Sequence, residues 1–201
     1  PVAWFHTASM GEFEQGRPII EDYKKENPSH FILVTFFSPS GYEVRKNYAG
    51  ADYVSYLPLD GFFNSKRFLD LVKPSLAVFV KYEFWHYYLT GLKKRAVPTI
   101  LVSAIFRPNQ VFFRWYGGFY RRLLDCFTHL FVQDQSSADL LNRTNVTVAG
   151  DTRFDRVLDT LQNPVSWDLV TQFLDNTEFM VVGSAWQADM DCLIPIINSK
   201  K

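Results

Sequence analysis

The stretch Trp4-Phe5-His6-Thr7-Ala8-Ser9-Met10-Gly11-Glu12 decides which fold this chain adopts. An apolar run over 2–5 stops at a Ser-x-Gly-Glu turn, and apolar residues at roughly helical spacing follow. This order predicts an open α/β sheet, in which ligands bind at the carboxyl ends of the strands. Gly11 lets backbone amides come close to a ligand, and a helix start favours an anion. Because the turn also carries a carboxylate, Glu12, the pattern indicates a base that acts on a hydroxyl rather than simple phosphate binding.

The composition limits the class of protein. The chain has 201 residues, of which 47% are hydrophobic, with 21 basic and 21 acidic side chains. This is enough for one good core and part of a second domain. The balanced charge argues against nucleic acid as a main partner. Cys126 and Cys192 form neither a metal-ligand spacing nor a disulfide framework, which favours a reducing compartment. No apolar run is long enough to span a membrane, and no signal peptide is visible.

Short β-branched or aromatic runs alternate with helical patterns over residues 2–149. We expect strands at 2–6, 31–36, 52–56, 76–80, 98–103, 129–132 and 146–149, and helices at 12–26, 40–48, 62–72, 85–95, 110–125 and 135–142. Such alternation predicts right-handed crossovers and a doubly wound, mainly parallel, Rossmann-like sheet with helices on both faces. Asp60 and Ser65 are plausible caps near the helix expected at 62–72.

The end of the chain has a different pattern. Residues 153–175 predict one or two linker helices broken at Pro164, and 179–184 predict a strand followed by a glycine turn. An apolar helix is expected at 189–198. Another α/β unit would begin in this way, so we expect the chain to be a piece of a longer protein, cut at both ends. Since that strand would lack its partners, we expect it to dock on the first domain or to pair with another molecule.

Two further turns carry polar residues at strand ends. The second strand leads into Ser38, Ser40 and Gly41 before a helix, which suits either an anion or an ordinary helix cap. The fourth strand is wholly apolar and runs into Lys81 and Glu83, so it projects two opposite charges into the crevice of this fold class. The alternative for that pair is a surface ion pair of little energetic value.

The segment 106–122 mixes four arginines with seven aromatic residues and contains no acid. This mixture suits a membrane interface, where aromatic rings lie at headgroup level and cations meet anionic lipid. Single-stranded nucleic acid would suit it too, but the neutral net charge argues against that. The remaining alternative is a core helix whose arginines reach out to solvent.

Taken in order, these motifs resemble the 3-deoxy-D-manno-octulosonic acid (Kdo) transferases of lipopolysaccharide synthesis. The matches are His6, Ser9, Gly11 and Glu12 for His-x-x-Ser-x-Gly-Glu; Thr35, Ser38, Ser40 and Gly41 for Thr-x-x-(Ser/Thr)-x-(Ser/Thr)-Gly; Tyr56, Pro58 and Asp60 for Tyr-x-Pro-x-Asp; Glu83 and Trp85 within Glu-Thr-Glu-x-Trp-Pro-Asn; Gly150, Phe154 and Asp155 within Gly-Asn-x-Lys-Phe-Asp; and Gly183, Ser184 and Trp186 for Gly-Ser-(Thr/Ser)-Trp. The resemblance covers nearly the whole chain.

The chain departs from the family pattern at several positions. Lys81 replaces the first acid of the fourth-strand motif, and His86 and Tyr87 replace its Pro-Asn. After the fifth strand, 103–107 stands where the family has Asn-Ala-Arg-Leu-Ser. We interpret Lys81 and Arg107 as cations that other members supply elsewhere.

The resemblance implies the N-terminal half of a two-domain glycosyltransferase of the GT-B type. Residues 1–152 would bind the lipid A precursor acceptor, 153–177 would form linker helices, and 178–201 would begin the domain that binds the CMP-Kdo donor, with Gly183 and Ser184 as donor contacts. Glu12 would be the base. The acceptor contacts would be His6, Ser9, Gly11, Ser38, Ser40, Gly41, Lys81, Glu83 and Arg107. No metal or other cofactor is expected, and the protein would work at the cytoplasmic face of the bacterial inner membrane. The piece itself would be inactive.

Two other interpretations remain open. One is a non-catalytic α/β domain whose turns bind an anionic ligand. The other is a different GT-B enzyme, such as a lipid A disaccharide synthase. A complete gene that continued for about another α/β domain would separate the transferase from the simple binding domain.

Overall fold

The computed structural model describes residues 1–162, 168, 170, 172 and 180–199. The chain divides into two compact units, Pro1–Gln162 and Asn163–Lys201, which are considered separately. The first unit contains a seven-stranded, all-parallel sheet in the order β3-β2-β1-β4-β5-β6-β7. The strands are β1 (Val2–His6), β2 (Phe31–Phe36), β3 (Tyr53–Tyr56), β4 (Leu76–Val80), β5 (Thr99–Ala104), β6 (His129–Val132) and β7 (Val146–Val148). The predicted fold class is confirmed.

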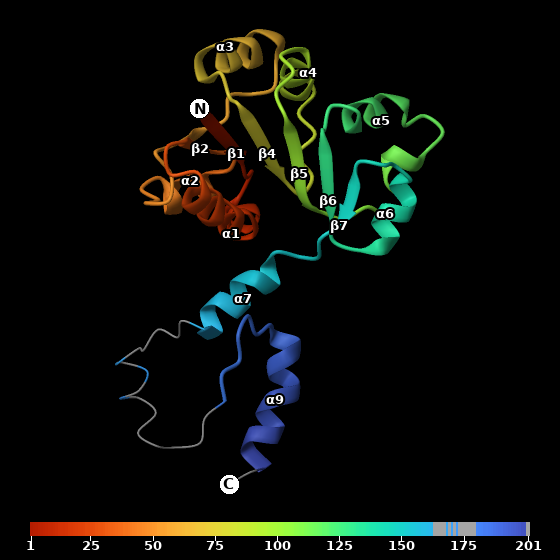
Figure 1. The fold of residues 1–201 in the computed structure, drawn as a ribbon. Helices are drawn as coiled ribbons and strands as arrows, with labels where there is room; N and C mark the ends of the chain where they lie inside the picture. Colours follow the sequence, from red (N-terminus) through yellow and green to blue (C-terminus); the bar gives the residue numbers. More distant parts are fainter. Residues whose placement is uncertain (163–167, 169, 171, 173–179, 200–201) are drawn as a thin grey trace. The chain divides into compact units, whose positions relative to one another are not determined.

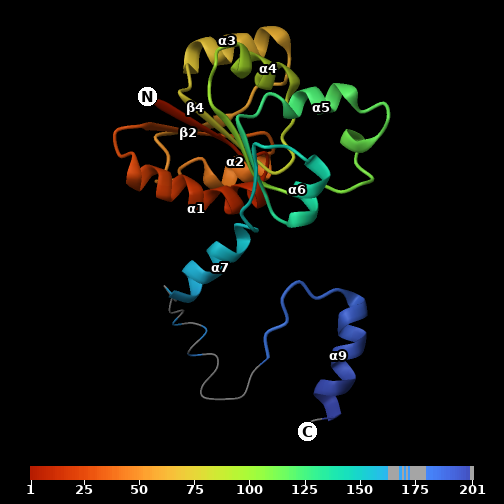
Figure 2. The same cartoon turned by 45° about the vertical axis from the view of Figure 1, so that its right-hand side comes forward.

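Helices cover both faces of this sheet (Figures 1 and 2). On one face lie α1 (Met10–Glu26) and α2 (Pro39–Arg45). On the other lie α3 (Phe62–Val72), α4 (His86–Lys94) and α5 (Gly118–Leu124), whose buried residues share a core cluster with Leu141 of α6 (Gln135–Leu141). Strand side chains alternate between the two cores: Trp4 packs into one, and Ala3 and Phe5 pack into the other. Burial on both faces explains why these strands read as continuous apolar runs.

The strand order reverses at β1, because the chain runs outward through β2 and β3 and then returns to β4 on the other side of β1. The loops after β1 and β4 therefore diverge to opposite faces of the sheet and leave a crevice at their carboxyl ends, where ligands bind in this architecture. The turns that follow β1, β2 and β4 all open at this edge.

Two sequence predictions inside the first unit are wrong. The helix expected at 110–125 is a 3₁₀ turn, η1 (Val111–Phe113), followed by α5. It is interrupted at Arg114, which has an extended backbone (ψ 153°), and in the turn that follows a Cβ at Gly117 would lie 2.0 Å from the carbonyl oxygen of Val111. Asp60 does not cap α3, whose N-cap is Gly61, but instead accepts hydrogen bonds from the N–H groups of Tyr87 and Tyr88 in α4. Ser65 is buried inside α3 and donates to the carbonyl of Phe62.

The C-terminal region agrees with the predictions only in its helices. The first part of 153–175 is the helix α7 (Arg153–Gln162), which belongs to the first unit, and the apolar helix is α9 (Gln187–Ser199). The linker role of 153–177 stays a prediction. The predicted strand is wrong where it is described, because 180–182 have no regular secondary structure. Residues 178 and 179 and most of 163–175 lie outside the described residues. Docking or intermolecular pairing of this tail stays a prediction.

Candidate functional site

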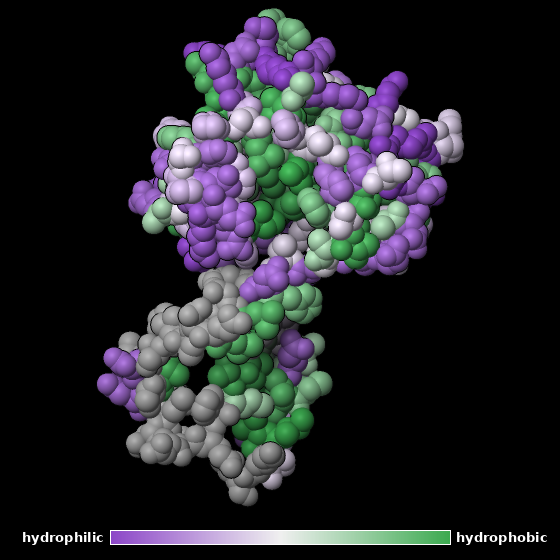
Figure 3. All heavy atoms as spheres, viewed as in Figure 1, coloured by the Kyte–Doolittle hydropathy of each residue, from purple (hydrophilic) through white to green (hydrophobic). Residues whose placement is uncertain are grey.

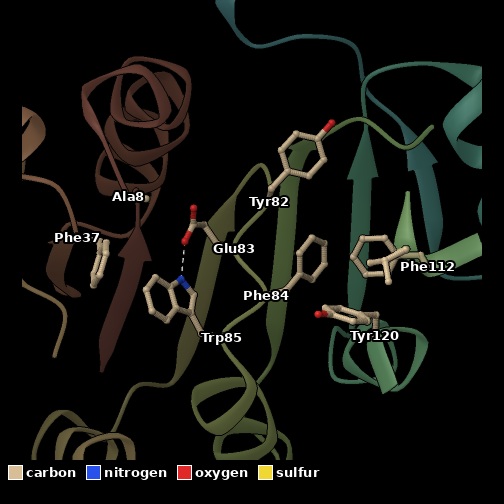
Figure 4. Close-up of a pocket in the computed structure, with 9 residues that line it drawn as sticks. Ala8, Phe37, Tyr82, Glu83, Phe84, Trp85, Phe112 and Tyr120 are labelled. Atoms are coloured by element: carbon tan, nitrogen blue, oxygen red, sulfur yellow. Dashed lines mark hydrogen bonds between the residues drawn. The ribbon is translucent and has the colours of Figure 1, made fainter. Parts of the chain in front are cut away.

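A cavity of about 530 Å³ lies at the carboxyl edge of the sheet. Its walls come from the turns after β1, β2 and β4 and from the segment after β5 (Figure 4). The lining residues are Ala8, Phe37, Tyr82, Glu83, Phe84, Trp85, Val111, Phe112 and Tyr120. Six of these nine side chains are aromatic and one is a carboxylate, which is a combination suited to a sugar-like ligand that has both apolar faces and hydroxyl groups. On the side of the molecule drawn in Figure 3, hydrophobic residues gather in the middle of the first unit.

Glu83 is the charged residue among those that line this cavity, and two hydrogen bonds fix its carboxylate. Its Oε2 lies 3.2 Å from Nε2 of His6 and also accepts from the indole N–H of Trp85. His6 is fully buried at the end of β1, and the Glu83 side chain is only 13% exposed. Figure 4 shows the other carboxylate oxygen pointing away from Trp85. The structure therefore brings together His6 and Glu83, which are 77 residues apart in the sequence.

Glu12 lies in the first turn of α1 and is half-buried. The Ser9 hydroxyl donates to its Oε2, so Ser9 does not cap the backbone N–H groups of the helix. These N–H groups carry the positive end of the helix dipole. Gly11 leaves open space beside them, since the nearest atom to a Cβ there would be the Ser9 Oγ at 3.8 Å. Glu12 does not itself line the cavity, whereas Ala8 of the same turn does.

The turn after β2 is an ordinary helix cap with a packing glycine. The Ser38 hydroxyl accepts from the Ser40 N–H at 3.2 Å and lies 2.8 Å from the Ser40 hydroxyl. Gly41 is buried, and a Cβ there would lie 2.3 Å from the Phe36 ring and 3.0 Å from the backbone of Ser9. The neighbouring N–H groups of Phe37 and Ser38 donate to the Ala8 carbonyl. This turn therefore supports the turn after β1, and Phe37 is the residue by which it reaches the cavity.

Of the twelve predicted site residues, Glu83 is the one that lines the cavity. Seven others lie in the contacts and turns described above, and four remain to be placed. Lys81 follows β4 with a left-handed backbone (φ 66°), and the exposed Arg107 follows β5. Gly183 and Ser184 belong to the second unit, where both are exposed. Their roles in binding stay predictions.

The comparisons with known proteins agree with this geometry. Residues 1–156 match the family model of the 3-deoxy-D-manno-octulosonic-acid transferases. The chain belongs to the Kdo transferase family. The Kdo transferase of Aquifex aeolicus is 43% identical over 102 residues, which cover 50% of this chain and 27% of that protein. The Kdo transferase of Chlamydophila psittaci is 26% identical over 209 residues, which cover 98% of this chain and 48% of that protein. The chain thus spans about half the length of relatives that it matches from end to end.

Solved structures of other enzymes share the fold. UDP-GlcNAc 2-epimerase from Neisseria meningitidis superimposes with a TM-score of 0.63 at 16% identity, over 88% of this chain and 54% of that chain. The epimerase from Methanocaldococcus jannaschii gives a TM-score of 0.60 at 18% identity, over 89% of this chain and 53% of that chain. At these identities the likeness concerns the fold alone, and it confirms the predicted Rossmann-like architecture of the GT-B type.

The arginine- and aromatic-rich segment 106–122 lies partly in the core and partly at the surface. Phe106 and Phe112 are buried in the core, whereas Trp115 is 91% exposed. In the described residues, none of the four arginines of this segment forms an ion pair with an acid. The Arg121 guanidinium instead donates to the carbonyls of Phe112 and Arg114. Neither a pure core helix nor a uniformly exposed surface describes the segment.

Several residues of the site were not selected from the sequence. The Thr35 hydroxyl bonds Nδ1 of His6, and the indole N–H of Trp4 donates to that hydroxyl. Tyr82, Phe112 and Tyr120 form cavity walls. Only the aromatic density of 106–122 hinted at the last two. The phenol of Tyr82 donates to the Ile105 carbonyl, and burial raises its pKa further above neutral pH.

Two searches of the described residues gave no candidate. Among them, no three His, Cys, Asp or Glu side chains are grouped so that they could hold a metal ion. Within the same part of the chain, none of the helices combines the length and the apolar character needed to cross a membrane.

Proposed function

We propose that this chain is the acceptor-binding half of an inverting glycosyltransferase that transfers Kdo from CMP-Kdo to a lipid A precursor. Family membership supports the Kdo transfer. The cavity carries the proposal about the acceptor, because it combines aromatic walls with one fixed carboxylate at the crevice of the sheet. An aromatic wall packs on the apolar face of a sugar ring, and a carboxylate accepts a hydrogen bond from a hydroxyl.

The reaction needs a base, because a sugar hydroxyl is a poor nucleophile at neutral pH. We assign this role to Glu12. The hydroxyl oxygen of the acceptor forms a bond to the anomeric carbon of Kdo while the bond from that carbon to the phosphate oxygen of CMP breaks. The electron pair leaves with CMP, and the hydroxyl proton passes to Glu12. The backbone N–H groups at the start of α1 have no side-chain cap and would stabilise negative charge that develops near them in the transition state.

The donor half of the site is a separate proposal. Gly183 and Ser184 would contact CMP-Kdo as part of a second nucleotide-binding domain, and the 201-residue chain alone would bind acceptor without transferring Kdo. The reaction would proceed with no metal and no other cofactor. The whole enzyme would act at the cytoplasmic face of the bacterial inner membrane.

The surface of 106–122 supports a membrane-facing role. Trp115 and Tyr116 are 91% and 59% exposed, and Arg107, Arg114 and Arg122 lie beside them in the sequence and are also exposed. We expect the chain to co-sediment with vesicles that contain anionic lipid, and to release as salt rises. Trp115→Ser should weaken this binding. Tyr53→Ser, which removes a 60% exposed ring on the edge strand β3, is the matched control and should not weaken it. If both variants bind the vesicles equally well, segment 106–122 does not face the membrane.

A chimera tests the proposed activity. This chain would replace the part of the Chlamydophila psittaci Kdo transferase that it matches, which is 48% of that protein. We expect the purified chimera to transfer Kdo from CMP-Kdo to a lipid A precursor. A folded chimera that binds CMP-Kdo but transfers Kdo to no lipid A precursor would contradict the proposal. Binding of an anionic ligand without transfer would favour the simple binding domain.

A further inference from the structure

Two neighbouring strands, β1 and β2, place a series of hydrogen-bonded polar groups behind Glu83. The indole Nε1 of Trp4 lies 2.8 Å from the Oγ1 of Thr35, and that oxygen lies 2.9 Å from Nδ1 of His6. On the far side of the ring, Nε2 of His6 lies 3.2 Å from Oε2 of Glu83. Trp4, His6 and Thr35 are each fully buried, so bulk solvent does not reach them.

One arrangement of protons satisfies every donor and acceptor in this series of groups. An indole N–H is a donor only, so Trp4 occupies a lone pair of the Thr35 hydroxyl. An ionised carboxylate is an acceptor only, so the nitrogen of His6 that faces Glu83 carries a proton. The Thr35 hydroxyl then has one hydrogen to give, and Nδ1 of His6 is the acceptor within reach. Every group is satisfied when the imidazole is neutral and protonated on Nε2.

Other protonation states leave a buried group unsatisfied. If Nδ1 alone carried the proton, the lone pair of Nε2 would face the carboxylate. If both nitrogens carried protons, the indole N–H of Trp4 and the Nδ1–H of His6 would both point at the Thr35 hydroxyl oxygen. The hydrogen of that hydroxyl would then have no acceptor among the described residues. The Thr35 carbonyl lies 3.2 Å from Nδ1 and has a second lone pair beside the one that accepts the Thr7 N–H at 3.0 Å, so it could accept a hydrogen bond from Nδ1. The hydrogen of the Thr35 hydroxyl would still lack an acceptor among the described residues. Buried polar groups in native proteins are rarely left without a partner.

We infer that Trp4, Thr35 and His6 are positioning residues that hold the Glu83 carboxylate so that its Oε1 is left to accept a hydrogen bond from a ligand. Two donors, His6 and Trp85, occupy its Oε2. No described residue donates to Oε1, which is the oxygen turned away from Trp85 in Figure 4. The cavity therefore selects a ligand group that donates a hydrogen bond, of which a sugar hydroxyl is the class that follows if the proposed function is right.

Nitrogen NMR of the histidine rings tests the inference on the full 201-residue chain. Long-range ¹⁵N–¹H correlation distinguishes the three protonation states of an imidazole without any ligand or activity. The His6 signals are assigned by substituting His30, His86 and His129 one at a time. We expect His6 at pH 7 to show an unprotonated Nδ1 and a protonated Nε2. A proton on Nδ1, with or without one on Nε2, would overturn the inference.

Matched variants separate positioning from simple packing. Thr35→Val keeps the shape of the side chain but removes the hydroxyl, so the His6 ring should lose its single tautomer. Thr35→Ser should restore it. Thr147→Val is the control, because it removes a hydroxyl that lies 2.9 Å from His129 and should leave the His6 signals unchanged. An unchanged His6 spectrum in Thr35→Val would also overturn the inference.

The chimera described above tests whether the hydrogen bonds behind Glu83 affect turnover. There Thr35→Val should lower kcat about tenfold, equivalent to about 1.4 kcal/mol, and Thr35→Ser should restore it. Full turnover in Thr35→Val would overturn the positioning role. If the unsubstituted chimera is inactive while His6 shows the expected tautomer, the proposed function fails and the inference about Glu83 stands.

Discussion

The turns after β1 and β4 each present a carboxylate at the same edge of the sheet, but they hold it very differently. Glu83 after β4 is bound by His6 and Trp85 and is nearly buried. Glu12 after β1 is half-buried, and the Ser9 hydroxyl of its own turn is its hydrogen-bond donor among the described residues. One carboxylate is fixed by tertiary structure, and the other depends on a local contact.

This difference suits two separate tasks. A fixed acceptor orients a ligand, because its position does not change when the ligand arrives. A base must take up a proton during the reaction, and a carboxylate with a single hydroxyl donor can do so without breaking a buried network. On this comparison we propose that Glu83 orients the ligand and that Glu12 takes up the proton.

The largest expected effect comes from removing the base. In the chimera with the Chlamydophila psittaci protein, Glu12→Gln should lower kcat at least about 100-fold, because the amide cannot take the proton of the acceptor hydroxyl. Steady-state kinetics would measure this. Glu26→Gln, at the exposed far end of the same helix, is the control and should retain full turnover. Near-normal turnover of Glu12→Gln would exclude Glu12 as the base.

Two glycines sharpen the description of the turn after β1. Gly41→Ala should destabilise the fold by about 1–3 kcal/mol, because its Cβ would meet the Phe36 ring and the Ser9 backbone at 2.3 and 3.0 Å. Gly11→Ala has room and should raise stability by roughly 0.5–1 kcal/mol. Urea unfolding of the two variants would measure both. If Gly11→Ala also leaves acceptor binding unchanged, the close approach of a ligand to this backbone is ruled out.

The turn after β4 should respond to the loss of its helix cap. Asp60 accepts the N–H groups of Tyr87 and Tyr88 at 3.1–3.3 Å, so Asp60→Ala should cost about 1 kcal/mol. Hydrogen exchange of those two amides should accelerate, while that of α1 should not. Equal acceleration in both helices would mean that the two turns are not held independently.

The smallest expected effect depends on pH. The Arg153 guanidinium holds the pKa of Asp151 below its usual range, and Gln15 of α1 also donates to this carboxylate, at 3.1 Å. Because the folded pKa is depressed, the stabilisation is present above about pH 4 and is lost as pH falls through the folded value. At pH 7 the free energy of unfolding of Asp151→Asn should be lower than that of the natural chain by up to about 1 kcal/mol, as measured by urea unfolding. A gap that does not close in acid would show that the charge of Asp151 contributes nothing.

The sheet could be predicted from the sequence because strands buried on both faces must be apolar runs. The seven expected strands lie within one residue of those observed at each end. The helix expected at 110–125 is interrupted at Arg114, whose backbone is extended (ψ 153°), and the tight turn that follows leaves no room for a Cβ at Gly117. Sequence periodicity does not register such a turn.

The site was harder to predict than the sheet. Glu12 and Glu83 were found at strand ends, but the contact of His6 with Thr35 and Glu83 depends on the register of β1 with β2 and β4. Thr35 lies directly opposite His6 in that register. A local motif names each residue and does not reveal that the residues meet, so the distinction between a fixed and a locally held carboxylate required the three-dimensional structure.

Titration of the chain with the deacylated sugar of a lipid A precursor, followed by NMR, tests the central claim most directly. If the cavity between the two turns binds the acceptor, the indole N–H of Trp85 and the amides of Ala8 and Glu83 should shift saturably. Glu83→Ala should abolish these shifts, while Glu26→Gln should not. A saturable titration that leaves these three signals in place and perturbs residues outside the cavity would contradict the account.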